Sequence, residues 1–137
     1  LIGQYFGGRA EVKSFEISDA AFSGNIPGAL EKVRWALENK IAPVFVVATF
    51  ASGLRNMTAV ATAGPSLSDS DIAKSHGMPP FKVKSLRNSL RGWSHNGLAQ
   101  AISVVAQADT DVKGGAAEPG WVIERLVIDI AKARDLR

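Results

Sequence analysis

The chain has 137 residues, of which 46% are hydrophobic and 21% charged, and its net charge is +3. A chain of this length and composition forms one domain with a real core, so a disordered tail is excluded. The sequence contains no cysteine. That excludes a disulfide framework, a thiolate nucleophile and a cysteine-ligated zinc site.

The longest nearly apolar run, from Ile41 to Ala51, is interrupted by Pro43 and Thr49. It is much shorter than the ~20 residues that a membrane-spanning helix needs, so we interpret it as part of a buried helix. The chain begins at Leu1 and carries no charged-then-apolar signal segment. We therefore expect a fragment of a larger cytosolic protein that makes no membrane contact.

The first residues differ from the rest of the chain. An early pair of glycines and a weak alternation at Phe15 and Ile17 predict an extended or linker segment through residue 17. Ser18 is then expected to cap a helix of one or two turns over residues 19–23, which Gly24 closes. The sequence therefore predicts a short leader outside the main domain.

Two long helices are predicted next. Asn25 and Pro27 form an N-cap with a first-turn proline, and apolar residues then recur on one helical face as far as Asn39. Pro43 opens a second helix, which is apolar on most of its circumference and ends at Gly64. A helix of this kind is buried on several sides, so we expect it to be the central helix of the domain.

A short helix and a basic helix follow. Ser68 or Ser70 is expected to cap a helix over residues 71–75, which Gly77 stops. The prolines at positions 79 and 80 then begin a helix that reaches Trp93. Its basic residues interleave with apolar ones and are Lys82, Lys84, Arg87 and Arg91.

Two amphipathic helices complete the chain. Ser94 caps the first, two glycines at 114 and 115 end it, and Asp109 can pair with Lys113 across one turn. Pro119 begins the last helix. No other segment alternates like a strand. The predicted fold is all-α, a compact bundle of five to six helices behind the leader.

Charge is unevenly distributed along the sequence. No acidic residue lies between Asp71 and Asp109, whereas that stretch holds five basic residues. The remaining chain sums to −2, from 11 basic and 13 acidic residues. A basic segment on a neutral background indicates an acidic partner, either nucleic acid or an acidic protein face. A solvated helix face is the alternative.

No constellation of catalytic residues stands out. His76 and His95 lie beside predicted loops or caps, away from a spaced carboxylate, so we interpret them as exposed turn residues. No serine lies in a Gly-x-Ser-x-Gly context, and the glycines near residue 24 lack the Gly-Lys-Ser/Thr of a phosphate loop. We expect no catalytic, cofactor or metal site in this chain.

An ordered set of short segments runs through the sequence: Gly7–Phe15, Ser18–Gly24, Ala29-Leu30 with Arg34, Pro43-Val44, Leu54-Arg55, Gly77–Pro80, Trp93-Ser94, Asp109 and Val112–Gly114. Taken together, the set resembles the C-terminal region of the delta subunit of the bacterial DNA polymerase III clamp loader. The segments are most similar to those of actinobacterial delta subunits. The resemblance covers nearly the whole chain, and it rests on the order of the segments, since no single one is specific.

The resemblance implies a three-domain protein of the AAA+ group, in which a RecA-like domain and a helical lid precede a helical collar. Residues 1–17 would be the tail of the lid and the connection, and residues 18–137 the collar domain. The collar would pack into a ring with the clamp-loader ATPase (gamma/tau) and delta-prime subunits, at the replisome in the cytoplasm. The sliding-clamp contact would belong to an N-terminal domain outside this chain, and the delta subunit would have no ATPase activity.

In this interpretation the chain is a mechanical scaffold for DNA replication. Apolar side chains on its outer faces would contact the neighbouring collars, and helical phase selects Phe45, Phe50, Trp93 and Trp121. The basic helix would face either an acidic side of a neighbouring collar or the template DNA.

The alternative from another class is a free-standing helical DNA-binding domain. The short helix that ends at Gly77 and the basic helix after it would then imitate a helix-turn-helix. Its recognition helix would begin Pro-Pro-Phe, which is a poor surface for base edges. An enzyme is a weaker interpretation still, because no titratable constellation supports it.

Overall fold

A computed structural model describes residues 14–115 and 118–137 of the chain. Within these residues the secondary structure is entirely helical, and the predicted all-α fold is confirmed. A first helix covers residues 14–22 and will be called helix 14–22. The others are α2 (Ile26–Glu38), α3 (Pro43–Ala63), α4 (Asp69–His76), α5 (Pro80–Leu90), α6 (His95–Gly114) and α7 (Pro119–Asp135).

The helix starts follow the predicted capping chemistry. The Asn25 side chain accepts a hydrogen bond from the Gly28 N–H at 3.1 Å, which satisfies a free donor at the start of α2. Ser94 does the same for α6, accepting from the Gly97 N–H at 2.9 Å. A left-handed glycine, Gly115, ends α6 (φ +68°), where a side chain would strain the backbone.

Helix α3 is the central element of the fold. It packs against α4, α5, α6 and α7, and its buried residues run from Val46 to Val60. By length and composition alone it could cross a membrane, a test that the core helix of a globular domain also passes. Its packing on four neighbours explains its apolar circumference, and the predicted central buried helix is confirmed.

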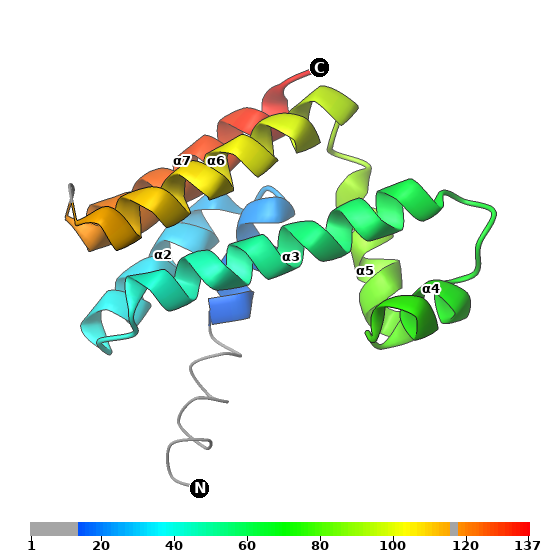
Figure 1. The fold of residues 1–137 in the computed structure, drawn as a ribbon, viewed down its shortest axis with the longest axis horizontal. Helices are drawn as coiled ribbons and strands as arrows, with labels where there is room; N and C mark the ends of the chain where they lie inside the picture. Colours follow the sequence, from blue (N-terminus) through cyan, green and yellow to red (C-terminus); the bar gives the residue numbers. More distant parts are fainter. Residues whose placement is uncertain (1–13, 116–117) are drawn as a thin grey trace, which may run out of the picture.

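The remaining helices are arranged around α3 in two groups (Figure 1). Helices α6 and α7 form an antiparallel pair along one side, and α2 packs against α7. Helices α4 and α5 form a smaller pair at the opposite end of the long axis from the α6–α7 connection. The basic helix α5 is therefore remote from the start of α7.

The expectation of an extended leader through residue 17 is wrong for residues 14–17, which belong to helix 14–22. Ser18 lies inside this helix, and its hydroxyl donates to the Phe15 carbonyl at 3.0 Å instead of capping a helix start. Ile17 is fully buried, and the Ser14 carbonyl accepts from the Thr49 hydroxyl of α3 at 3.2 Å. Tertiary burial against α3 overrides the weak local alternation. The glycine pair at 7 and 8 lies outside the described residues.

Two other helix ends differ from the expected positions. Helix α4 begins at Asp69, because Ser68 is its cap and accepts from the Asp71 N–H at 3.1 Å. Helix α5 ends at Leu90, short of the predicted Trp93. The next three N–H groups bond three residues back, at 3.0–3.3 Å, so the chain tightens into a turn that carries Trp93 into the core.

Candidate interaction surfaces

Two of the four predicted interface residues lie in the core, so their expected place on an outer face is wrong. Phe50 is 0% exposed and Trp93 8% exposed. Both pack edge-on against Phe22 of helix 14–22, with ring centroids 5.7 and 6.1 Å apart. The Trp93 indole N–H also donates to the Phe22 carbonyl at 2.8 Å. Helical phase alone could not show that helix 14–22 covers this face of α3.

The other two predicted interface residues keep some exposure. Phe45 is half-buried near the start of α3. Trp121 is 50% exposed near the start of α7, and the Arg125 guanidinium lies 5.1 Å from the centroid of its ring. A half-exposed tryptophan held by a cation–π contact is a residue type enriched at the centres of protein interfaces. The interface role of both residues stays a prediction.

The basic helix is less basic in the folded chain than in the sequence. Lys82 pairs with Asp19 of helix 14–22 at 3.0 Å. Arg87 pairs with Asp69 at 2.9 Å and also donates to the Leu67 carbonyl. Lys84 and Arg91 are exposed and make no ion pair with the described residues. The structure therefore divides the four predicted contact residues into two that fasten α5 to its neighbours and two that face solvent.

Both histidines are exposed, as predicted, His76 at the end of α4 and His95 at the start of α6. Among residues 14–115 and 118–137, no three His, Cys, Asp or Glu side chains converge as a metal site would require. Four ion pairs join a Lys or Arg nitrogen to an Asp oxygen within these residues, at 2.9–3.5 Å. All four involve exposed or half-exposed groups.

An apolar groove lies between α3 and α6. It has a volume of about 490 Å³, and Ile102 on its α6 side is 52% exposed. A further pocket of about 200 Å³ shares Ile102 and Thr58 and extends toward His95. The main groove is lined by Ala48, Ala51, Leu54, Arg55, Thr58, Ile102, Val105, Ala106 and Asp109. We call these two pockets together the α3–α6 groove.

The α3–α6 groove is almost free of charge because of its sequence. Arg55 is the one charged residue of α3, and α6 holds no Asp, Glu, Lys or Arg before Asp109. Asp109 is paired with Lys113 at 3.0 Å. Small side chains such as Ala51 and Ala106 allow a further helix to approach closely. None of the four predicted interface residues lines this groove, although the long uncharged stretches in both helices are a signal for it in the sequence.

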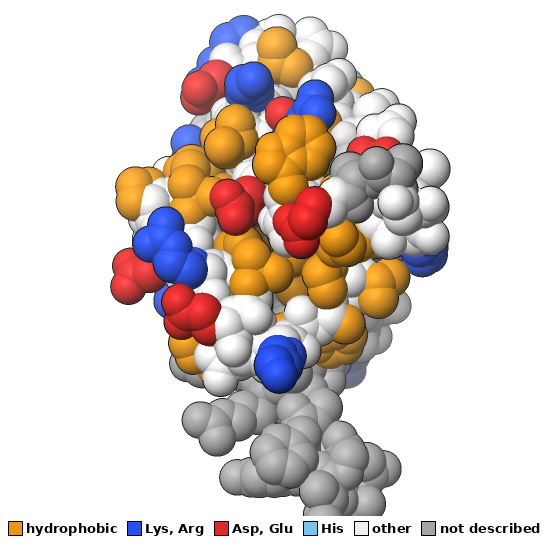
Figure 2. All heavy atoms as spheres, turned by 90° about the vertical axis from the view of Figure 1, so that its left-hand side faces the viewer, with side chains coloured by type: hydrophobic (Ala, Val, Ile, Leu, Met, Phe, Trp, Pro, Cys, Tyr) orange, Lys and Arg blue, Asp and Glu red, His pale blue; other side chains and the backbone are white. Residues whose placement is uncertain are grey.

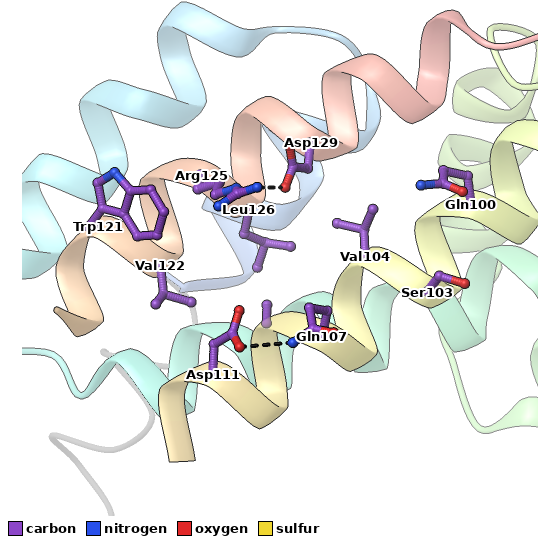
Figure 3. A pocket seen from close by; sticks show the side chains of 11 residues that line it. Gln100, Ser103, Val104, Gln107, Asp111, Trp121, Val122, Arg125, Leu126 and Asp129 are labelled. Atoms are coloured by element: carbon purple, nitrogen blue, oxygen red, sulfur yellow. Dashed lines mark hydrogen bonds and ion pairs between the residues drawn. The ribbon is translucent and has the colours of Figure 1, made fainter. Parts of the chain in front are cut away.

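A second groove lies on the other side of α6, between α6 and α7 (Figure 3). It also has a volume of about 490 Å³. Trp121, Val122 and Leu126 contribute from α7, whereas Gln107 and Asp111 face them from α6. Arg125 pairs with Asp129 at 3.5 Å, and the Gln107 amide donates to Asp111 at 2.9 Å. We call this pocket the α6–α7 groove.

Figure 2 looks onto the end of the molecule where α2 ends and α3 begins. Hydrophobic side chains gather on this face, with acidic side chains near the centre of the view. Among the large side chains exposed in the described residues are Val44 at 42% near the start of α3 and Trp121 at 50% near the start of α7. This end is therefore of mixed character, unlike the basic face of α5.

Comparison with known proteins identifies the family. The family described as "DNA polymerase III delta subunit, C-terminal domain" matches residues 11–130, which is most of the chain. The chain belongs to this family. The resemblance that the ordered segments suggested is thereby confirmed. No curated protein sequence matches the chain.

A solved structure shows the same fold as this delta C-terminal domain. It is the DNA clamp loader delta protein of Bacillus subtilis, with a TM-score of 0.75 and 20% sequence identity. The match covers 90% of this chain and 37% of that one, so the chain spans little more than a third of the length of its structural relative. At this identity the likeness establishes the helical fold.

Proposed function

We propose that this delta C-terminal domain is a non-catalytic collar that joins its subunit to the clamp-loader ATPase (gamma/tau) and delta-prime subunits during DNA replication in the cytoplasm. The observation that carries the proposal is the family match over residues 11–130. The fold shared with a clamp-loader delta protein supports it. The rest of the subunit, including its sliding-clamp contact, would lie in domains before the collar.

The α3–α6 groove is the surface best suited to this assembly. Its apolar floor and small rim residues match the chemistry of helix-on-helix packing between subunits. Ile102 projects from it with half of its surface exposed, and burial of such a side chain contributes roughly 1 kcal/mol or more. A neighbouring collar that lays one helix in the groove would cover Ile102 and the exposed alanines together.

The assembly is tested with the full-length protein, mixed with the same organism's ATPase and delta-prime subunits on a sizing column with light scattering. We expect a stable mixed complex. Ile102→Glu should abolish co-elution, because a carboxylate in an apolar contact costs several kcal/mol. Thr110→Glu is the matched control, since Thr110 lies on α6, is exposed and lines neither groove.

Two results would contradict this proposal. One is a wild-type protein that stays alone at concentrations well above the micromolar range. The other is an Ile102→Glu protein that enters the complex as well as Thr110→Glu does. Melting temperatures of both variants, measured in parallel, separate a loss of assembly from a loss of folding.

A direct contact with DNA is the second candidate function. The observation that favours it is the exposed face of α5 and its C-cap, where Lys84 and Arg91 make no ion pair with the described residues and Phe81 is 74% exposed. A complete helix-turn-helix is not favoured, because Lys82 and Arg87 are held by Asp19 and Asp69.

Binding of labelled DNA to the full-length protein at several salt concentrations tests the contact. The double variant Lys84→Gln with Arg91→Gln should lower the salt slope by about 2, since each phosphate contact contributes about 0.9. The double variant Lys82→Gln with Arg87→Gln is the control, which should change DNA binding less. Equal slopes for all three proteins would remove α5 from the interface.

A further inference from the structure

We propose that the α6–α7 groove binds a short segment of another protein that carries an arginine or lysine beside an apolar side chain. The site is distinct from the α3–α6 groove assigned to assembly, because the two have no lining residue in common. The proposal therefore does not depend on the collar function.

The floor of the groove is built for an apolar anchor. Val122 and Leu126 are only 3% and 2% exposed, and the partly buried Val104 faces them from α6. Trp121 closes one end and keeps half of its surface exposed (Figure 3). A volume of about 490 Å³ lies within the range of pockets that bind small ligands. Tryptophan at the edge of such a pocket is a residue type that often dominates binding energy.

The rim of the groove favours a cation. Asp111 on α6 and Asp129 on α7 contribute carboxylates from opposite walls, whereas Arg125 is the one basic residue among those lining the groove. The other polar lining residues are the uncharged Gln100, Ser103 and Gln107. The lining therefore has a net charge of −1, which attracts basic segments and repels phosphate groups. This sign argues for a protein segment rather than a nucleic acid or an anionic lipid.

Arg125 shows how the groove would hold an incoming cation. Its guanidinium lies 5.1 Å from the Trp121 ring centroid and 3.5 Å from an Asp129 oxygen, so it uses both a cation–π contact and a carboxylate. The Arg125 side chain is 61% exposed and the pair is long, so solvent and a competing cation can displace it. Asp111 accepts from the Gln107 amide and pairs with no cation of the described chain. It offers a charged partner that is already in place.

The test is selection of phage-displayed random dodecapeptides on the full-length protein, with the uncharged Ile102→Gln in the α3–α6 groove so that the apolar assembly surface does not compete. We expect enriched peptides in which arginine or lysine adjoins leucine, isoleucine or an aromatic residue. A fluorescein-labelled copy of the most enriched peptide is then measured by fluorescence polarisation. Trp121→Ala should weaken its binding at least tenfold and Asp111→Asn about fivefold. Thr110→Ala, an exposed position on α6 that lines neither groove and whose change adds no charge, should leave it unchanged.

Three outcomes would overturn the proposal: no enrichment, enrichment of acidic peptides, or binding that Trp121→Ala and Asp111→Asn leave unchanged. Melting temperatures of both variants close to the wild-type value would show that loss of binding is local. Both residues lie outside the α3–α6 groove, and the proposal assigns Trp121 to a peptide contact in place of the predicted contact with a neighbouring collar. Co-elution with the ATPase and delta-prime subunits should therefore survive both substitutions. A failed selection with normal co-elution would reject only this site. A successful selection with no co-elution would reject only the assembly proposal.

Discussion

Helix α6 forms one wall of two grooves of similar volume, and the two differ in chemistry. On the α3 side it contributes Ile102, Ala106 and Asp109 to an apolar groove whose acidic residue is already paired. On the α7 side it contributes Ser103, Gln107 and Asp111 to a polar rim. The two sets are offset by one or two residues, which turns a side chain by 100–200° around a helix. A short offset in sequence thus separates an assembly surface from a cation-binding one.

The largest effect should come from Gly97, where α6 approaches α7 closely enough to set the spacing between the two walls of the α6–α7 groove. A Cβ at Gly97 would lie 2.5 Å from the Ala133 carbonyl oxygen of α7, and backbone cannot move aside cheaply. We expect Gly97→Ala to destabilise the domain by about 2–3 kcal/mol, a typical cost of overpacking. Urea unfolding followed by circular dichroism measures the loss.

Gly114→Ala is the matched control on the same helix. A Cβ there meets nothing within 4 Å, so alanine should be neutral or stabilise α6 by up to about 1 kcal/mol through helix propensity. Equal unfolding free energies for the two variants would show that α6 and α7 tolerate a wider spacing. The close approach at Gly97 would then not fix the width of the α6–α7 groove.

The next effect concerns Trp93, which was expected at an interface and instead lies at the foot of α6. Trp93→Phe removes the indole donor and leaves the Phe22 carbonyl without its side-chain partner. We expect a loss of about 1–2 kcal/mol in unfolding free energy, the cost of an unmade buried hydrogen bond. Co-elution with the other subunits should persist, which distinguishes a core role from an interface role. A variant that keeps its stability but fails to assemble would restore the original prediction.

The sequence predicted the helices better than the surfaces, for a physical reason. Capping is local, so Asn25, Ser68 and Ser94 could be recognised from the residues that follow them. Exposure is a property of the assembled fold. Trp93 is buried because helix 14–22 lies over α3, and that helix was predicted to start only after Ser18.

The two grooves could not be predicted from one helix at a time. Each needs two helices side by side, and the order of α3, α6 and α7 in space is set by packing between distant segments. The acid-free stretch of α5 was visible in the sequence. Its partial neutralisation was not, because Asp19 and Lys82 are far apart in the chain yet lie 3.0 Å from each other.

Arg125 allows the α6–α7 groove to be altered without disturbing the fold. Arg125→Gln removes the resident cation and leaves Asp111 and Asp129 to attract an incoming one, so a basic peptide should bind a few-fold more tightly. Unfolding free energy should change by less than about 0.5 kcal/mol, because the side chain is exposed. Weaker peptide binding in this variant would mean that Arg125 itself contacts the partner, which would reverse the charge assigned to that partner.

The smallest effect should come from the ion pair between Lys113 and Asp109, a residue that lines the α3–α6 groove. Lys113 and Asp109 lie one helical turn apart with atoms 3.0 Å apart, and both side chains are about half exposed. Such pairs contribute roughly 0.3–0.5 kcal/mol and are screened by salt, so Lys113→Gln should lower the melting temperature slightly at low salt and not at 1 M salt. The same change removes the Lys113 partner of the Asp109 carboxylate in the groove that Arg55, the one cation of α3, also lines. If the apolar character of the groove drives assembly, co-elution of Lys113→Gln with the other subunits should weaken only modestly. Loss of co-elution as complete as that expected for Ile102→Glu would show that the α3–α6 groove also recognises charge.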